Sequence, residues 1–262
     1  LHNLVVDLNP GKEEAFRAGH EAKHAENYRI NSFHLGEGSP KQKFRANMDA
    51  IYTLKALENQ NRDATPEEQE TLANYVGWGG LADAFDAEKT AWTGEYKELK
   101  AALTEEEYAA ARASTLNAHY TSPTVIRSIY EALDGMGFEK GNILEPSMGV
   151  GNFFGMLPDS MLGSRLYGVE LDSITGRIAQ KLYPQAEIKV AGFETTDRRD
   201  FYDLAVGNVP FGNYRVSDKP YDKLGFSIHN YFFAKALDQV RPGGIVAFVT
   251  SRYTMDSKNP DA

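Results

Sequence analysis

The sequence predicts an α/β protein: a doubly wound, Rossmann-like parallel sheet preceded by a helical N-terminal region. From about residue 120, short apolar runs expected as strands alternate with segments of helical periodicity. Such alternation is typical of a parallel sheet with helices on both faces. Three polar or glycine-containing motifs each follow one of the apolar runs, and ligands bind at the carboxyl ends of strands in such sheets. A ligand site is therefore expected there.

The elements of the sheet region follow from this pattern. We expect strands near residues 142–145, 165–170, 186–190, 202–207 and 244–250. Helices are expected near residues 173–183 and 228–240, the second with Leu237 in its core. A further helix begins after Thr121-Ser122-Pro123 and ends at Gly135.

The N-terminal region shows helical signals instead. Residues 65–68 and 104–107 each read as a capping box, which marks a helix start. Residues 76–81 are expected to form a tight turn around a buried Trp78. We therefore divide the chain into a helical accessory region (residues 1–110) and a sheet domain (residues 111–262). One more helix is indicated by apolar residues at helical spacing: Phe44, Met48, Ile51, Leu54 and Leu57.

Composition excludes several classes of protein. The chain has no cysteine, so it has no disulfide, no cysteine-ligated metal and no thiolate nucleophile for methylation at cytosine carbon 5. We expect a cytoplasmic protein with no membrane segment and no metal site; His20, Glu21 and His24 have ligand spacing but read as solvated side chains. Because the chain begins at Leu1 and ends at residues 259–262, we expect a piece of a longer polypeptide, truncated in its sheet domain. We also expect this piece to be monomeric.

The net charge of −9 argues against independent affinity for a phosphate backbone. The acidity is unevenly distributed, however. Residues 1–110 hold 12 Lys and Arg against 20 Asp and Glu, whereas residues 111–262 hold 16 against 17. DNA binding is therefore expected to depend on other parts of the parent protein.

The first motif, residues 144–152, contains Gly149 and Gly151 in the spacing of a dinucleotide fingerprint. The third glycine is displaced, with Phe154 in its place, which disfavours a nicotinamide-dependent oxidoreductase. Glu145 would repel a pyrophosphate but attract an α-ammonium group. This favours an amino-acid moiety such as the methionine half of S-adenosylmethionine, although a simple tight turn is the alternative.

The second motif places Glu170 at the end of the next expected strand, 19 residues after Gly151. A carboxylate in that position can accept hydrogen bonds from both hydroxyls of a ribose. The alternative is a solvated carboxylate at a strand end. Asp172 is expected to cap the following helix.

The third motif, residues 208–211, closes the apolar run 202–207. Pro210 favours an extended Val209 and removes one amide donor. The Asn208 side-chain oxygen and the Val209 carbonyl can then accept hydrogen bonds from one amine, while Phe211 stacks on the ring that carries it. An ordinary turn leaving the sheet is the alternative.

Residues 119–251 resemble S-adenosylmethionine-dependent DNA methyltransferases of the adenine N(6) type, in the gamma order of motifs. The family tetrapeptide is (Asp/Asn/Ser)-Pro-Pro-(Tyr/Phe/Trp), from which residues 208–211 depart only at Val209. The acid that reads the cofactor adenine in the family is displaced here to Glu194. The resemblance implies these catalytic residues: Asn208, Val209, Pro210 and Phe211. It implies these cofactor-binding residues: Tyr120, Thr121, Glu145, Pro146, Gly149, Gly151, Asn152, Phe153, Glu170, Leu171, Phe193, Glu194 and Asn208.

The resemblance further implies methyl transfer from S-adenosylmethionine to the exocyclic amine of adenine in DNA. The helical first part, together with this domain, is similar to methylase regions fused to helicases in large proteins of bacterial mobile elements. Two alternatives remain open at this point. The same tetrapeptide serves enzymes that methylate a glutamine amide in proteins, and the departures at Val209 and Glu194 are compatible with a non-catalytic module.

Overall fold

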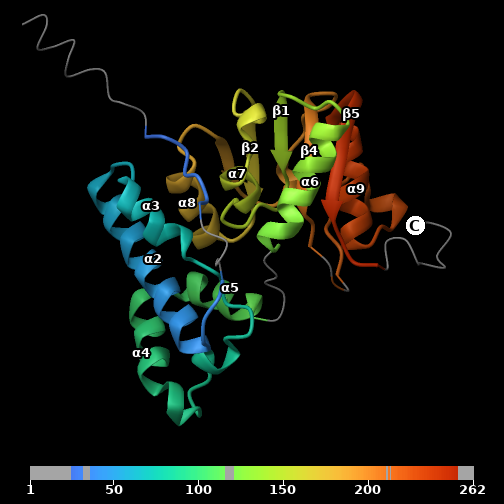
Figure 1. Ribbon diagram of the computed structural model, residues 1–262. Helices are drawn as coiled ribbons and strands as arrows, with labels where there is room; N and C mark the ends of the chain where they lie inside the picture. The colour runs from blue at the N-terminus through green and yellow to red at the C-terminus, as the bar shows by residue number, and fades with distance from the viewer. Residues whose placement is uncertain (1–24, 32–35, 116–120, 211, 213, 253–262) are drawn as a thin grey trace, which may run out of the picture.

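The computed structural model describes residues 25–31, 36–115, 121–210, 212 and 214–252 (Figure 1). Its helical region is built from α2 (Pro40–Gln60), α3 (Pro66–Ala73), η1 (Ala82–Phe85), η2 (Thr90–Trp92), α4 (Thr93–Ala102) and α5 (Glu105–Ser114). The α/β part begins with α6 (Pro123–Gly135), β1 (Asn142–Glu145), α7 (Asn152–Gly155), η3 (Asp159–Met161) and β2 (Arg165–Glu170). It continues with α8 (Ser173–Leu182), β3 (Glu187–Val190), η4 (Phe193–Thr195), β4 (Tyr202–Asn208), η5 (Asp222–Leu224), α9 (Ile228–Gln239) and β5 (Val240–Val249).

Local sequence sets the ends of the helices in the N-terminal region. Thr65 and Thr104 each form the predicted capping box, with Glu68 and Glu107 respectively. Each box satisfies two backbone donors that a helix start leaves without partners. All five apolar residues predicted to share one face of α2 are buried. The predicted turn around a buried Trp78 is also confirmed.

Five parallel strands form one sheet in the order β3-β2-β1-β4-β5. The predicted α/β fold is therefore confirmed, with four strands close to the expected positions. The fifth begins at Val240, four residues earlier than expected. Its early part is irregular, because the register with β4 shifts between Tyr202 and Leu204, and Gly243 has a φ of +82°.

The two faces of the sheet bury alternate residues of each strand. Ile143 and Leu204 pack in one apolar cluster with α6, α7 and α8. Leu144 and Ala205 pack in a second cluster with α9 on the other face. This period of two is the geometry of a strand, and burial on both faces explains why the strands read as continuous apolar runs.

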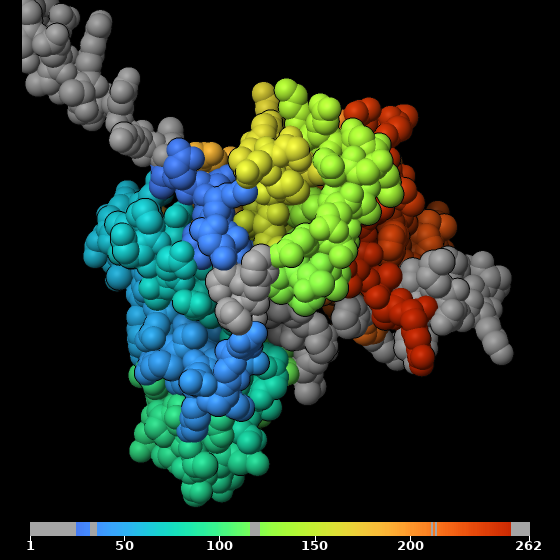
Figure 2. All heavy atoms as spheres, viewed as in Figure 1, coloured from blue at the N-terminus to red at the C-terminus, as the bar shows by residue number. Residues whose placement is uncertain are grey.

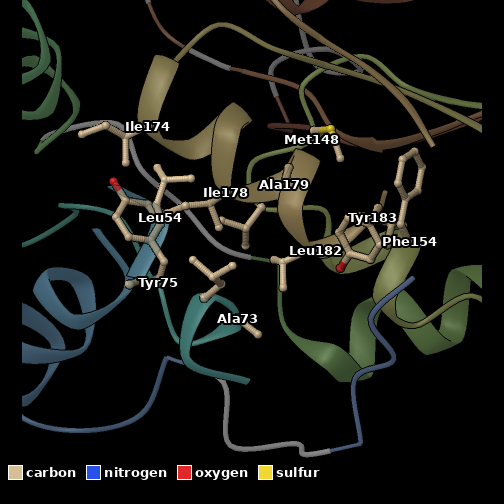
Figure 3. Close-up of a cluster of buried hydrophobic side chains, with 14 of the residues drawn as sticks. Leu54, Ala73, Tyr75, Met148, Phe154, Ile174, Ile178, Ala179, Leu182 and Tyr183 are labelled. Carbon is tan, nitrogen blue, oxygen red and sulfur yellow. The ribbon is translucent and has the colours of Figure 1, made fainter. Parts of the chain in front are cut away.

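Helix α8 joins the two parts of the molecule. Its residues Ile174, Ile178 and Leu182 are buried in the same cluster as Leu54 of α2 and the chain just after α3 (Figure 3). Ionic contacts border this core: Arg177 of α8 lies 3.1 Å from Glu58 and 2.5 Å from Glu107. One apolar core thus runs across the predicted boundary at residues 110–111, and that boundary remains a prediction.

Residues 25–31 lie along the outside of this junction, between the helical region and the α/β part (Figure 2). The Tyr28 amide donates to the Leu182 carbonyl at 2.8 Å, and the Ile30 amide donates to the Gly155 carbonyl at 2.9 Å. A Cβ atom at Gly155 would lie only 2.7 Å from the Ile30 side chain, so the segment needs a glycine there. Within the described residues, no helix is long and apolar enough to cross a membrane.

We predict that Leu54→Ala lowers the free energy of unfolding by about 2–5 kcal/mol, because it leaves a cavity in the shared core. Chemical denaturation should show a single unfolding transition for both proteins, with its midpoint at a lower denaturant concentration in Leu54→Ala. Leu237→Ala is the matched control: Leu237, predicted to be helix core, is 62% exposed on α9, so its loss should change stability by less than about 0.5 kcal/mol. Two separate transitions, with only the first shifted by Leu54→Ala, would contradict a shared core.

Candidate cofactor and catalytic site

A cavity of about 250 Å³ lies at the carboxyl edge of the sheet. The strand order reverses between β1 and β4, and such a switch point is where open α/β sheets bind ligands. Nine residues predicted from the sequence line the cavity: Thr121, Glu145, Gly149, Asn152, Phe153, Glu170, Asn208, Val209 and Pro210. Motifs that are far apart in the sequence therefore share one volume.

The two glycines of the turn after β1 have different structural roles. Both have positive φ, +56° at Gly149 and +84° at Gly151. Nothing lies within 4 Å of the place where a Cβ atom would stand at Gly149, so the backbone is open to a ligand there. A Cβ atom at Gly151 would lie 2.5 Å from the Tyr183 ring and 2.9 Å from Met148. Gly151 therefore serves close packing and does not line the cavity.

Glu145, at the end of β1, is a buried carboxyl group that faces the cavity. Its side chain is almost fully buried, and its Oε2 atom has no hydrogen-bond partner within the described part of the chain. Burial, and secondly the charge of Glu170, raise the pKa of Glu145 well above its usual range. A buried polar atom without a partner is costly, which suits a site completed by a cationic or hydrogen-bond-donating ligand.

Glu170, at the end of β2, is held by two backbone donors. The amides of Gly149 and Asp172 each donate to its carboxylate at 2.8 Å. Burial, and to a smaller extent the nearby charge of Asp172, nevertheless raise the pKa of Glu170 to about 7. A carboxylate has about four acceptor positions, so Glu170 retains the capacity to accept from a further donor.

The tetrapeptide motif begins at the last residue of β4. Asn208 pairs in register with Val249 of β5, and the Val209 amide donates to the Val249 carbonyl at 3.1 Å. Gly207 brings the motif close to β1, because a Cβ atom there would lie 3.2 Å from the Glu145 Cγ atom. Asn208, Val209 and Pro210 thus sit beside the buried acid. Phe211 lies outside the described residues.

Helix starts place three more of the predicted residues at the cavity. Ser122 caps α6 by accepting from the Val125 amide, which leaves Thr121 immediately before the helix, at the cavity wall. Asn152 and Phe153 open α7, and the Tyr130 hydroxyl donates to the Phe153 carbonyl at 2.8 Å. Tyr120 lies outside the described residues, as do His20, Glu21 and His24.

Several predicted cofactor residues are not brought to the cavity. Leu171 is 76% exposed, and Phe193 is buried on the α9 side of the sheet, stacked on Phe232 with 5.0 Å between ring centroids. Glu194 and Pro146 are likewise absent from the cavity wall. The aromatic cluster on that face accounts for the position of Phe193. Recognition of the cofactor adenine by Phe193 and Glu194 stays a prediction.

The structure adds cavity residues that the sequence analysis did not assign to the site. The helical region contributes Tyr75, Gly77 and Ser114, and the α/β part contributes Ser147, Met148, Asp172, Thr175 and Tyr214. Asp172 also caps α8, as predicted, by accepting from the Thr175 amide at 2.8 Å. The glycines of the turn at residues 76–81 were the only sequence signal for the contribution of the helical region.

Two curated proteins are similar in sequence, and no family model matches the chain. Over 230 residues, or 86% of this chain, it is 27% identical to the "Defense against restriction protein B" of Escherichia phage P1. Over 93 residues, or 35% of this chain, it is 37% identical to the "Type II methyltransferase M.CvrRI" of Paramecium bursaria Chlorella virus XZ-6E. The matched stretches span only 9% and 24% of those proteins.

Likenesses to solved structures are weaker. A Listeria monocytogenes protein described as a class I S-adenosylmethionine-dependent methyltransferase is 12% identical, with a TM-score of 0.44 over 83% of this chain and 76% of that one. The DhpI–SAM–HEP complex is 19% identical, with a TM-score of 0.31 over 53% of this chain and 63% of that one. The fold assignment rests on the strand order described above and not on these likenesses.

We predict that Gly149→Ala and Gly151→Ala differ in their effect on stability. Each forces a residue with a Cβ atom into a positive-φ conformation, which costs about 1 kcal/mol. Gly151→Ala should cost about 1–3 kcal/mol more, because its Cβ atom overlaps the Tyr183 ring. Chemical denaturation of the ligand-free protein measures both values. Equal losses for the two variants would contradict the roles given to these glycines.

We predict that the free energy of unfolding falls as pH rises from about 4.5 to about 7. Glu170 keeps its proton in the folded protein up to the raised pKa of about 7, whereas the unfolded chain releases it near 4.5. The folded state therefore binds more protons in this window, and Glu145 contributes in the same direction. Denaturation of Glu170→Gln across this range should show a shallower dependence. The exposed Glu139→Gln is the control, and an unchanged slope in Glu170→Gln would refute the prediction.

Proposed function

We propose that this chain is the methyltransferase domain of a larger protein and transfers a methyl group from S-adenosylmethionine to the exocyclic amine of adenine in DNA. One observation carries the proposal. Asn208 and Val209 lie at the end of β4 in the same cavity as the buried Glu145 and the open Gly149 turn. This arrangement supports a function in which an amine is held beside an amino-acid-bearing nucleoside.

The residues of the cavity fit S-adenosylmethionine in four respects. The buried Glu145 carboxyl, whose Oε2 atom lacks a partner in the described chain, suits the ammonium group of the methionine moiety. The open backbone at Gly149 leaves room for the chain of the ligand, and Thr121 offers a hydroxyl for its carboxylate. Glu170 would accept hydrogen bonds from ribose hydroxyls.

The chemistry of the transfer sets what Asn208 and Val209 have to do. The cofactor supplies an electrophilic methyl group, but the exocyclic amine of adenine is a weak nucleophile because its lone pair is delocalised into the ring. The two N–H groups of the amine would donate hydrogen bonds to the Asn208 side-chain oxygen and the Val209 carbonyl. These hydrogen bonds favour a tetrahedral nitrogen with a localised lone pair. The same two oxygens stabilise the positive charge that develops on the nitrogen as the methyl–sulfur bond breaks. The sulfur would leave as a neutral thioether, and the methylated amine would then lose one proton to water.

Access to this cavity requires an unpaired base. Its amine must reach Asn208 at the sheet edge, which a base stacked in a duplex does not allow. The target base would be flipped out or already single-stranded, at a cost of about a few kcal/mol. With a net charge of −9, the chain itself is not expected to supply the affinity for DNA, so other parts of the parent protein would do so.

The names of the relatives favour DNA over a protein substrate. One is named for defense against restriction and the other is a type II methyltransferase, and restriction acts on DNA. Because the chain spans less than a quarter of each relative, the activity and partners of the whole protein, including a fused helicase, belong to this proposal.

We predict that Asn208→Ala in the full-length protein abolishes methyl transfer to DNA but leaves S-adenosylmethionine affinity within about twofold. The variant removes an acceptor of the amine while the cofactor wall at Glu145 and Gly149 remains. Tritium transfer to DNA measures the activity, and calorimetry measures the affinity. Asn208→Asp, which keeps an acceptor oxygen, should retain measurable transfer.

Three results would count against the proposal. Transfer at the wild-type rate in Asn208→Ala would remove the role given to that residue. Tritium incorporation into protein but not into DNA would favour the glutamine-amide alternative. Absence of cofactor binding to the wild-type protein would favour a non-catalytic module.

A further inference from the structure

The turn at residues 75–80, between α3 and η1, forms part of the cavity although it belongs to the helical region. Tyr75 and Gly77 both line the cavity together with residues from the ends of β1, β2 and β4. Tyr75 lies among Leu54, Ile174 and Ile178, at the packed junction between α2 and α8 (Figure 3). The turn is therefore positioned by the same apolar core that joins the two parts of the protein.

A buried amide fixes the conformation of this turn. The side chain of Asn47, fully buried in α2, donates to the Gly77 carbonyl at 2.6 Å and accepts from the Val76 amide at 2.8 Å. Gly77 has a φ of +68°, which suits glycine at this position. The Trp78 ring packs edge-on against Phe85, with 5.2 Å between centroids. The Asn47 hydrogen bonds and the packing of Trp78 therefore fix this turn before a ligand binds.

The turn faces the acidic corner at the end of β2. Burial, and secondly the charge of Asp172, raise the pKa of the Tyr75 hydroxyl, with a smaller contribution from Glu170, whereas a hydrogen bond with Thr175 lowers it. Thr175 in turn donates to the Asp172 carboxylate at 2.6 Å. Carboxylates and hydroxyls from both parts of the protein thus meet at one end of the cavity, away from the tetrapeptide motif.

This chemistry fits a ligand with two neighbouring hydroxyl groups. Each of the two hydroxyls of a ribose can donate one hydrogen bond, one to a carboxylate and the other to the oxygen of a phenol. Glu170 supplies the acceptor and the Tyr75 hydroxyl supplies the second group at the same corner. A purely apolar wall would serve the adenine ring but would leave the diol unmatched.

We infer that the turn at residues 75–80 is the outer wall of the ribose subsite, with Tyr75 contacting a ribose hydroxyl opposite Glu170; this rests on the proposed use of S-adenosylmethionine. The helical region is then a constituent of the cofactor site and not an accessory to it. Cofactor binding is coupled to the packing of α2 and α3 on α8.

The test compares binding of two ligands by calorimetry, S-adenosylhomocysteine and its 2′,3′-dideoxyribose analogue. The wild-type protein should bind S-adenosylhomocysteine more tightly than the analogue. Tyr75→Phe, which removes only the hydroxyl, should weaken binding of S-adenosylhomocysteine about fivefold and leave binding of the analogue unchanged. Tyr108→Phe is the matched control, because it removes a hydroxyl that hydrogen-bonds the Phe85 carbonyl within the helical region. It should alter neither affinity.

The outcomes separate this inference from the proposed function. If the wild-type protein binds neither ligand, the proposed cofactor is wrong. If the wild-type protein binds S-adenosylhomocysteine and Tyr75→Phe weakens both ligands equally, or neither, the ribose contact is wrong while the cofactor assignment stands. A loss in Tyr108→Phe equal to that in Tyr75→Phe would attribute the effect to a loosened helical region and would also overturn the inference.

Discussion

The packing of α8 against α2 and α3 is the interaction on which the candidate site depends. Ile178 and Leu182 of α8 share an apolar core with Leu54, and full burial of such side chains is worth about 1.5–3 kcal/mol each. The same helix begins at the acidic corner of the cavity, capped by Asp172. Apolar contact on one side of α8 therefore fixes where the helical region meets the sheet edge. The turn that carries Tyr75 reaches the cavity only because this contact holds.

A second constraint is electrostatic. Two glutamates, the buried Glu145 and the half-buried Glu170, end adjacent parallel strands, so the sheet brings their carboxyl groups to the same edge. Burial raises the pKa of both groups. The charge of Glu170 further raises the pKa of Glu145, and the charge of Asp172 raises the pKa of Glu170. Burying these acids lowers the free energy of unfolding near neutral pH. A ligand that offers an ammonium group and hydroxyls would offset that cost. Strain of this kind at a cavity is typical of sites where function outweighs stability.

The approach of β4 to β1 completes the arrangement. Gly207 leaves no side chain between the strands, which lets Asn208 sit beside Glu145 without displacing it. The cavity thus has Asn208 and Val209 at the end of β4, Glu145 at the end of β1 and Glu170 at the end of β2; we propose that the first accepts an amine and the last a diol. Their order follows the order of strands in the sheet and not the order of motifs in the sequence. The division into a helical accessory region and a sheet domain remains a prediction, and one apolar core contains residues from both parts.

The sequence by itself determined several helix starts, most of the strands and the motifs that end the strands. Capping boxes at Thr65 and Thr104, the apolar face of α2 and four of the five strands could be predicted because they depend on local patterns. The expected meeting of Glu145, Glu170 and Asn208 followed from the general rule for parallel sheets. Tertiary structure alone decided that Leu171 and Phe193 stand away from the cavity, that Leu237 is exposed, and that Tyr75 and Gly77 form a wall. Those positions depend on how distant helices pack around α8. Side-chain contacts between segments about a hundred residues apart produce no periodic pattern in the sequence of either segment.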